Sequence, residues 1–279
     1  MQSVPTLLIE PTHGLAALSL RDVWAYRELL YFLAWRDVKV RYKQTVLGVL
    51  WVVLQPLVSM AIFTVLFGIL LKVDSGDVPY PVFAFAGLLP WNYFSQALNR
   101  ASISVVSSSQ LISKIYFPRL VIPLSGVLSS LVDLAIAFGV LGVLMIVYGI
   151  VPTAALLALP ALVLLAMVTA LGFGLWLSAL NVRYRDVNYL LPFLIQIWMY
   201  VTPVVYGSEL VPARFRFLLS LNPMTSVVEG FRWALLGPAA DGDYLYGPLL
   251  GISVAISLIV LVTGAYFFRS TERTFADIV

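Results

Sequence analysis

Residues 120–182 read LVIPLSGVLSSLVDLAIAFGVLGVLMIVYGIVPTAALLALPALVLLAMVTALGFGLWLSALNV, and they contain a single charged side chain, Asp133. A helix that crosses about 30 Å of hydrocarbon needs about 20 apolar residues. The stretch is long enough for two such helices, with a break at Tyr148-Gly149-Ile150-Val151-Pro152, where glycine and proline favour a turn. It therefore predicts a pair of membrane-spanning helices.

Four further stretches carry no charge, namely residues 45–71, 78–99, 187–208 and 244–268. Together with the pair above they predict six transmembrane helices. The composition agrees, because 61% of the 279 residues are hydrophobic and 11% are charged, whereas soluble domains average about half apolar and about a quarter charged. The alternating segments of about ten residues that build a membrane barrel are not seen. The sequence predicts an all-α integral membrane protein with a tail (1–18), an interface helix (19–44) and a six-helix transmembrane domain (45–279).

The distribution of Lys and Arg predicts the orientation. With the N-terminus in the cytoplasm, 13 of the 17 fall on the cytoplasmic side, and Lys72, Arg214, Arg216 and Arg232 fall outside. Cytoplasmic segments of membrane proteins are enriched in Lys and Arg, so both termini are expected there. Residues 1–20 lack a basic segment followed by a continuous apolar core, so no cleavable signal peptide is expected. We expect a multi-pass protein of the cytoplasmic (inner) membrane.

Residues 19–44 have the pattern of an amphipathic helix. Trp24, Tyr31, Trp35 and Tyr42 are spaced by 7, 4 and 7 residues, so they share one helix face, and basic residues surround that face. Such a helix lies in the membrane interface with its rings at the level of the headgroups. It serves either as an anchor alone or also as a binding surface for lipid phosphates.

The loop over residues 100–119 contains a serine run that can start a short helix. Leu111, Ile112, Ile115 and Tyr116 form an apolar patch, followed by Phe117 and Pro118. An apolar patch on a cytoplasmic loop either docks on a partner protein or lies flat on the bilayer. We expect the former, with a separate ATPase subunit as the partner.

The external segment, residues 209–243, contains two short apolar stretches, 212–221 and 223–236, separated at Asn222-Pro223. Neither is long enough to span the membrane. They predict a re-entrant or lid-like pair of helices, which is allowed at membrane depth only when it is buried in protein. The alternative is an interfacial hairpin that covers the helix ends.

Several kinds of chemistry are missing. The chain has no cysteine and one histidine, His13, so a metal site within the chain is not expected. Paired catalytic acids and a phosphate-binding loop of the type Gly-x-x-x-x-Gly-Lys-Ser/Thr are also absent from the sequence. Asp133 is the one intramembrane carboxylate, and we expect a structural role for it. These features predict a transporter rather than an enzyme, with ATP and Mg²⁺ bound on another subunit and no nucleic acid as partner.

Aromatic residues gather in the second and fifth predicted spans. Ring faces pack on the C–H faces of sugars, but rings also form the ordinary belt at the membrane interface, and their number alone favours the belt. The candidates for a sugar path are Trp91, Tyr93, Phe94, Trp198, Tyr200 and Tyr206.

Four motifs carry a resemblance to a known family. They are residues 36–51 (RDVKVRYKQTVLGVLW, followed by Gln55-Pro56-Leu57), 181–187 (NVRYRDV), 202–206 (TPVVY) and 221–225 (LNPMT). In order and spacing the chain resembles the permease subunits of type-2 ABC exporters for polysaccharides or polyol phosphates, such as O-antigen and teichoic acid, over nearly all of its length after residue 20.

The resemblance implies a homodimeric permease bound to two copies of a cytoplasmic ATPase, with a coupling helix in the 100–119 loop. The implied substrate is a glycan on a polyprenyl pyrophosphate, whose sugars would pass an aromatic-lined channel at the dimer axis. The pyrophosphate would meet basic residues near the cytoplasmic interface, which here are Arg36, Lys39, Arg41 and Lys43. The alternatives are a type-2 ABC permease for a drug or lipid and, disfavoured by the missing acids and histidines, a membrane glycosyltransferase or acyltransferase.

Overall fold

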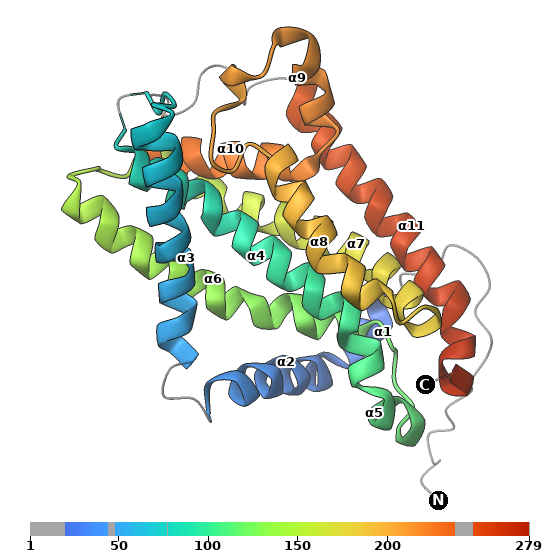
Figure 1. Cartoon of the computed structure of the whole chain (residues 1–279). Coiled ribbons are helices and arrows are strands. Elements are labelled where there is room, and N and C mark those ends of the chain that lie inside the picture. The colour runs from blue at the N-terminus through green and yellow to red at the C-terminus, as the bar shows by residue number, and fades with distance from the viewer. Residues whose placement is uncertain (1–19, 44–47, 77, 238–247, 279) are drawn as a thin grey trace, which may run out of the picture.

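The computed structural model describes residues 20–43, 48–76, 78–237 and 248–278, and every regular element among these residues is a helix (Figure 1). This confirms the predicted all-α fold. The tail over residues 1–18, with His13, lies outside the described residues. The helices are α1 (Leu20–Ala25), α2 (Arg27–Tyr42), α3 (Gly48–Phe63, continued as a π-helix over Thr64–Leu70), α4 (Tyr80–Ser107), α5 (Ser109–Lys114), α6 (Val121–Val147), α7 (Leu159–Arg183, preceded by a 3-10 turn at Ala154–Ala158), α8 (Val187–Val201), α9 (Ala213–Ser220, preceded by a 3-10 turn at Ser208–Leu210), α10 (Pro223–Leu236) and α11 (Pro248–Ile278).

Four helical segments in the described residues are long and apolar enough to cross a membrane. They are Leu50–Leu70, Val121–Val147, Ala154–Arg183 and Leu250–Glu272. These segments indicate a multi-pass membrane protein, and they coincide with four of the predicted spans, including the pair between residues 120 and 182.

The break between α6 and α7 falls where the sequence predicts it. Gly149 has a φ of +69°, and the N–H of Ile150 donates to the carbonyl oxygen of Met145 at 2.8 Å. A left-handed residue just after a helix, with a hydrogen bond reaching back over it, is a helix-ending arrangement that glycine adopts without steric cost.

The other two predicted spans correspond to α4 and α8, and neither has both the length and the apolar composition of the four helices above. α8 has 15 residues, which gives a length of about 22 Å at 1.5 Å per residue. α4 has 28 residues, but Asn92, Gln96 and Arg100 interrupt its apolar sequence. These polar groups are tolerated because α4 lies at the centre of the protein, where it packs against α6, α7 and α10.

Two hydrophobic clusters hold the helices together. The larger one joins α4, α6, α7 and α10 and includes Val204 and Val205. The smaller one lies at the end of the molecule where α2 and α5 are found, and it contains Leu33, Ile112, Phe117 and residues from α11 such as Phe268 and Phe275. Figure 1 shows α2 crosswise to the long helices at one end and α10 crosswise at the other.

The two short helices expected in the 209–243 segment are present as α9 and α10. Asn222 caps α10, because its side-chain oxygen accepts a hydrogen bond from the N–H of Met224 at 3.2 Å. Nearly every side chain of α10 is buried, against α4, α7 and α11. α10 is therefore part of the packed interior and not a loose cover.

Candidate functional site

The predicted interface helix forms two pieces, α1 and α2, which are separated at Tyr26. Trp24, Tyr31 and Trp35 are exposed, as expected for rings at a membrane surface. Tyr42 differs, because its side chain turns inward toward α6. The helix is thus attached to the bundle at its C-terminal end.

That attachment is a charged cluster around Asp133, a buried residue of α6. Arg41 of α2 and Arg100 of α4 both form ion pairs with its Oδ2 atom, the second at 2.7 Å, and the Tyr42 hydroxyl donates to its Oδ1 atom. We call these four residues the Asp133 cluster. The carboxylate therefore joins α2, α4 and α6, which agrees with the expected structural role.

The Tyr42 phenol remains a donor in this cluster. Burial, and then the hydrogen bond and the negative charge of Asp133, raise the pKa of Tyr42 to about 12. Because a phenol with such a pKa stays protonated at neutral pH, it donates a hydrogen bond to Asp133 and carries no negative charge that would repel the carboxylate. Arg100 is held further by Gln96, whose Oε1 atom lies 2.9 Å from Nη2.

A cavity of about 400 Å³ lies between α2, α4 and α6 on the surface side of this cluster. We call it the inner cavity. Its polar lining comprises Arg36, Asp37, Arg41, Arg100, Ser104, Ser107, Ser108 and Ser125. The hydroxyls of Ser104, Ser107 and Ser125 donate to carbonyl oxygens of their own helices, so an anion in the cavity would meet chiefly the guanidinium groups of the lining arginines. Guanidinium groups bind phosphate oxygens through paired hydrogen bonds.

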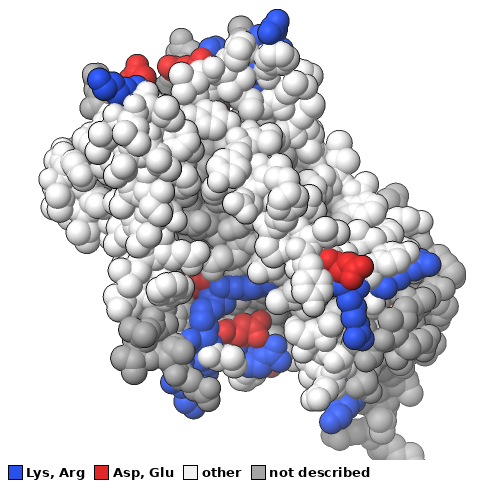
Figure 2. Space-filling model, in the orientation of Figure 1, with Lys and Arg blue, Asp and Glu red and all other residues white. Residues whose placement is uncertain are grey.

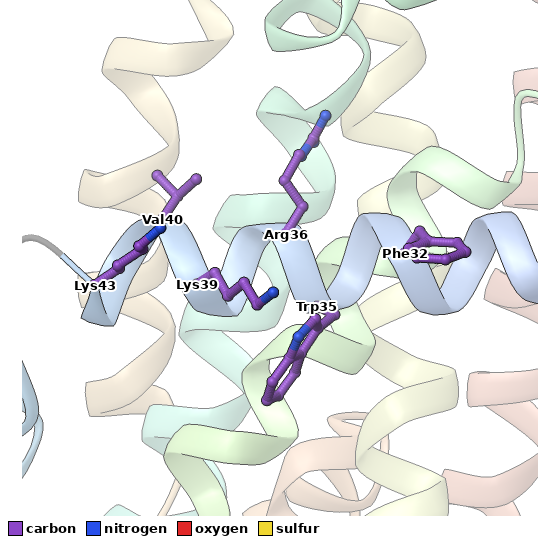
Figure 3. Close-up of a pocket in the computed structure, with 6 residues that line it drawn as sticks. All are labelled: Phe32, Trp35, Arg36, Lys39, Val40 and Lys43. Carbon is purple, nitrogen blue, oxygen red and sulfur yellow. The ribbon is translucent and has the colours of Figure 1, made fainter.

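A second, open groove of about 350 Å³ runs along α2, and we call it the outer groove. Figure 3 shows its lining residues, which lie on α2 or, for Lys43, directly after it: Phe32, Trp35, Arg36, Lys39, Val40 and Lys43. Lys39 lies over the Trp35 ring at 5.8 Å, and Arg36 forms an exposed ion pair with Asp37 at 2.9 Å. Figure 2 shows Lys and Arg gathered around a hollow at this end of the molecule.

The four predicted pyrophosphate residues thus divide between these two spaces. Lys39 and Lys43 line the outer groove, Arg41 lines the inner cavity, and Arg36 lines both. Arg100 was not among the predicted residues, although a charged residue at the end of an apolar stretch was a signal that could have found it.

The predicted coupling residues fall into two groups in the structure, one packed in the interior and one exposed. Ile112 and Phe117 are 8% and 4% exposed and belong to the smaller hydrophobic cluster, and Leu111 packs against it. Ile115 and Tyr116 are 57% and 70% exposed. The expected helix is shorter than the apolar patch, because α5 ends at Lys114 and Ile115 has an extended backbone.

The aromatic candidates are mostly packed inside the protein. Trp91, Tyr93 and Phe94 are buried in the larger cluster, so their ring faces cannot meet a sugar in this structure. The half-buried Trp198 touches Phe94 and Phe173 edge-on, with ring centroids 5.0 and 4.9 Å apart. Tyr206 is also half-buried, and its hydroxyl donates to the carbonyl oxygen of Tyr200. Of the six, Tyr200 has the most exposed ring.

Arg232 is a residue whose role the sequence did not reveal. The charge count predicts it in an external loop, but its side chain is fully buried on α10. Its guanidinium donates to the carbonyl oxygens of Val204 and Tyr206 and lies 3.9 Å from the centre of the Phe83 ring. Arg232 therefore links α10 to the turn after α8 through hydrogen bonds and to α4 through the Phe83 ring. Within the described residues, His, Asp and Glu nowhere gather in a group of three or more that could hold a metal.

Comparison with known proteins places these features in a family. Residues 28–236 match the family model described as ABC-2 type transporter. The chain is 29% identical to an O-antigen export system permease protein RfbA of Klebsiella pneumoniae, over 90% of this chain and 95% of the relative. It is 29% identical to a protein of the same name from Myxococcus xanthus, over 92% and 97% of the two chains. It is 24% identical to the polysialic acid transport protein KpsM of Escherichia coli, over 85% and 91%.

Proposed function

Because the chain belongs to the family of ABC-2 type transporters, we propose that it is the membrane-spanning subunit of an ATP-driven exporter that moves a lipid-linked polysaccharide across the cytoplasmic membrane. The observation that carries this proposal is the similarity, along at least 85% of the chain, to permeases named for O-antigen export and polysialic acid transport. The chain is a transport permease and not an enzyme. ATP and Mg²⁺ belong on a separate subunit.

We propose six spans, with α4 and α8 completing the four apolar ones. The end that carries α2 and α5 faces the cytoplasm, together with both termini, and α9 and α10 face outward as a re-entrant pair. The bias of Lys and Arg supports this orientation. The band without charges between the two charged ends in Figure 2 supports the crossing of the bilayer by the helices between them.

We propose that two copies enclose the path of the glycan, because a hydrated polymer does not fit among helices that fill their own core. α3 and α8 are the proposed walls. Both carry large exposed apolar side chains, including Trp51, Val58 and Ile62 on α3 and Phe193 and Tyr200 on α8. A closed twofold dimer is the commonest symmetric assembly.

The polyprenyl pyrophosphate of the substrate is proposed to bind at α2, with its phosphates in the inner cavity and the outer groove. Arg36, Arg41 and Arg100 supply guanidinium donors, and Lys39 and Lys43 supply further positive charge. Ile115 and Tyr116 are proposed to dock on the ATPase, because they are the exposed apolar side chains of the predicted coupling segment.

Reconstitution tests the proposal. The permease and its ATPase subunit are incorporated into vesicles, and ATP-dependent transfer of a lipid-linked glycan across the bilayer is measured. We expect transfer, and stimulation of ATP hydrolysis by the lipid-linked glycan. A complex that transports a drug or a phospholipid and ignores the lipid-linked glycan would support the alternative permease function instead.

A further inference from the structure

Asp133 lies in the middle of the apolar helix α6. An ionisable side chain at such a position is costly to bury and therefore points to a specific role. Its two arginine partners, Arg41 and Arg100, bring one more positive charge than Asp133 neutralises. Burying ionised groups is costly even when they are paired, and hydrophobic residues of similar volume often replace such groups without loss of stability. Attachment of α2 to the bundle alone therefore does not explain the cluster.

The position of the cluster suggests a second role. Arg41 and Arg100 line the inner cavity, whereas Asp133 does not and lies behind them. Both arginines bind the same carboxylate oxygen, Oδ2, and the Tyr42 hydroxyl holds the other oxygen. An anion in the cavity would meet the arginines from one side while Asp133 holds them from the other. The Tyr42 hydrogen bond would keep the carboxylate in place if the arginines shifted toward that anion.

We infer that Asp133 is an internal counter-ion that positions Arg41 and Arg100 and competes with the phosphate groups of the carrier lipid for them. The inference rests on the proposed binding of the carrier at α2. Asp133 is thus a positioning residue that limits how tightly the carrier headgroup is held. A carrier held by two uncompensated arginines would leave the cavity slowly, and affinity differences of this kind appear mainly in the dissociation rate.

Equilibrium binding and dissociation of a radiolabelled polyprenyl pyrophosphate, measured on the permease–ATPase complex in nanodiscs, test the inference. The variants form a charge series: Asp133→Asn adds one positive charge to the cluster, Arg100→Gln removes one, and the double variant restores the wild-type sum. Tyr42→Phe is the matched control, because it removes a hydrogen bond to Asp133 and changes no charge. An uncharged polyprenol serves as the control ligand.

We expect Asp133→Asn to lower the half-saturating amount of the pyrophosphate lipid and to slow its dissociation by about tenfold or more, because one unit charge within about 12 Å of the phosphate contributes at least about 1.4 kcal/mol at an effective dielectric constant of about 20. Arg100→Gln should weaken binding by a similar factor, and the double variant should return close to wild type. Tyr42→Phe should lower the melting temperature and leave the affinity within about twofold, because the charge sum is unchanged.

The outcomes separate the inference from the function on which it rests. If the wild type binds the lipid but Asp133→Asn binds it equally or more weakly, the counter-ion role is wrong and the carrier site stands. If Asp133→Asn does not fold, the comparison of Arg100→Gln with the double variant decides, because a counter-ion role requires the double variant to bind more tightly. If the wild type binds the polyprenol as well as the pyrophosphate, the carrier site itself is wrong, and the inference with it.

Discussion

The indole N–H of Trp198 donates to the side-chain oxygen of Asn222 at 2.9 Å. The same oxygen caps α10, and the Asn222 amide donates to the Thr202 hydroxyl at 2.8 Å. Thr202 in turn donates to the carbonyl oxygen of Trp198. These bonds join the end of α8, the turn that follows it and the start of α10, so α8 and α10 are expected to move together.

Asn222→Ala is the first test of this connection. The change removes the cap of α10, worth about 1 kcal/mol, and leaves the indole N–H without its acceptor, at a cost of about 1–3 kcal/mol. We expect a lower melting temperature of the purified permease and slower export. Trp198→Phe should cost less, and adding it to Asn222→Ala should cost less than the sum of the single effects, because the two residues share one interaction. Strictly additive effects would show that the residues are not coupled.

Gly87→Ala tests the packing around Arg232. A Cβ atom at Gly87 would lie 2.4 Å from the carbonyl oxygen of Val204 and 2.7 Å from Nη2 of Arg232. Overpacking of this kind costs about 1–3 kcal/mol, so we expect a clear fall in melting temperature. Gly139→Ala is the control, since Gly139 also lies in a long helix but has nothing within 4 Å of the added atom. Equal melting temperatures of the two variants would contradict the close approach of α4, Val204 and Arg232.

How well the sequence predicted the fold depended on how far apart along the chain the interacting residues lie. Local signals placed the break at Gly149 and the two short helices on either side of Asn222, because turn and capping preferences act over a few residues. The partners of Asp133 could not be predicted, because Arg41 and Arg100 lie 92 and 33 residues away along the chain. Pairing across such separations depends on how the helices pack.

The site was only partly predictable for a similar reason. The basic residues near α2 were identifiable from charge and motif. Their division between the inner cavity and the outer groove was not predictable from the sequence. The aromatic residues of α4 could not be assigned to a face, because α4 is surrounded by α6, α7 and α10 and most of its side chains are buried. Trp91 and Phe94 are accordingly interior residues and not residues of an open path.

Replacement of both Ile115 and Tyr116 by Asp tests the coupling segment. These side chains are exposed in the permease, so the permease should fold normally, but its ATPase should be lost on purification. Ile112→Ala is the contrasting variant: it removes part of a buried side chain, which costs about 2–5 kcal/mol, and should lower the melting temperature while the ATPase stays bound. Recovery of the ATPase in wild-type amounts with the double variant would exclude docking through these residues.

Cysteine labelling tests the six-span topology, because the natural sequence contains no cysteine. Asp74, Lys114, Arg185 and Arg214 are exposed, so a cysteine at each can react. Asp74→Cys and Arg214→Cys should react with an impermeant thiol reagent in intact cells. Lys114→Cys and Arg185→Cys should react only after the membrane is opened. Labelling of Lys114→Cys from outside would reverse the proposed orientation.

Crosslinking across the dimer tests the path of the glycan. Val58 and Ile62 of α3 are both about half exposed, four residues apart on one face of the helix. If α3 lines the interface of two copies, Val58→Cys and Ile62→Cys should each form a disulfide-linked dimer, and a trapped lipid-linked glycan should slow that reaction by occupying the space between the copies. Val143→Cys on α6 and Leu164→Cys on α7 are the controls, because their side chains are also exposed but lie on helices that are not proposed as walls of the path. Dimers that form through Val143→Cys or Leu164→Cys, and not through α3, would place the interface on α6 or α7. The exposed face of α3 would then belong to the lipid, and Tyr200 would be a belt residue.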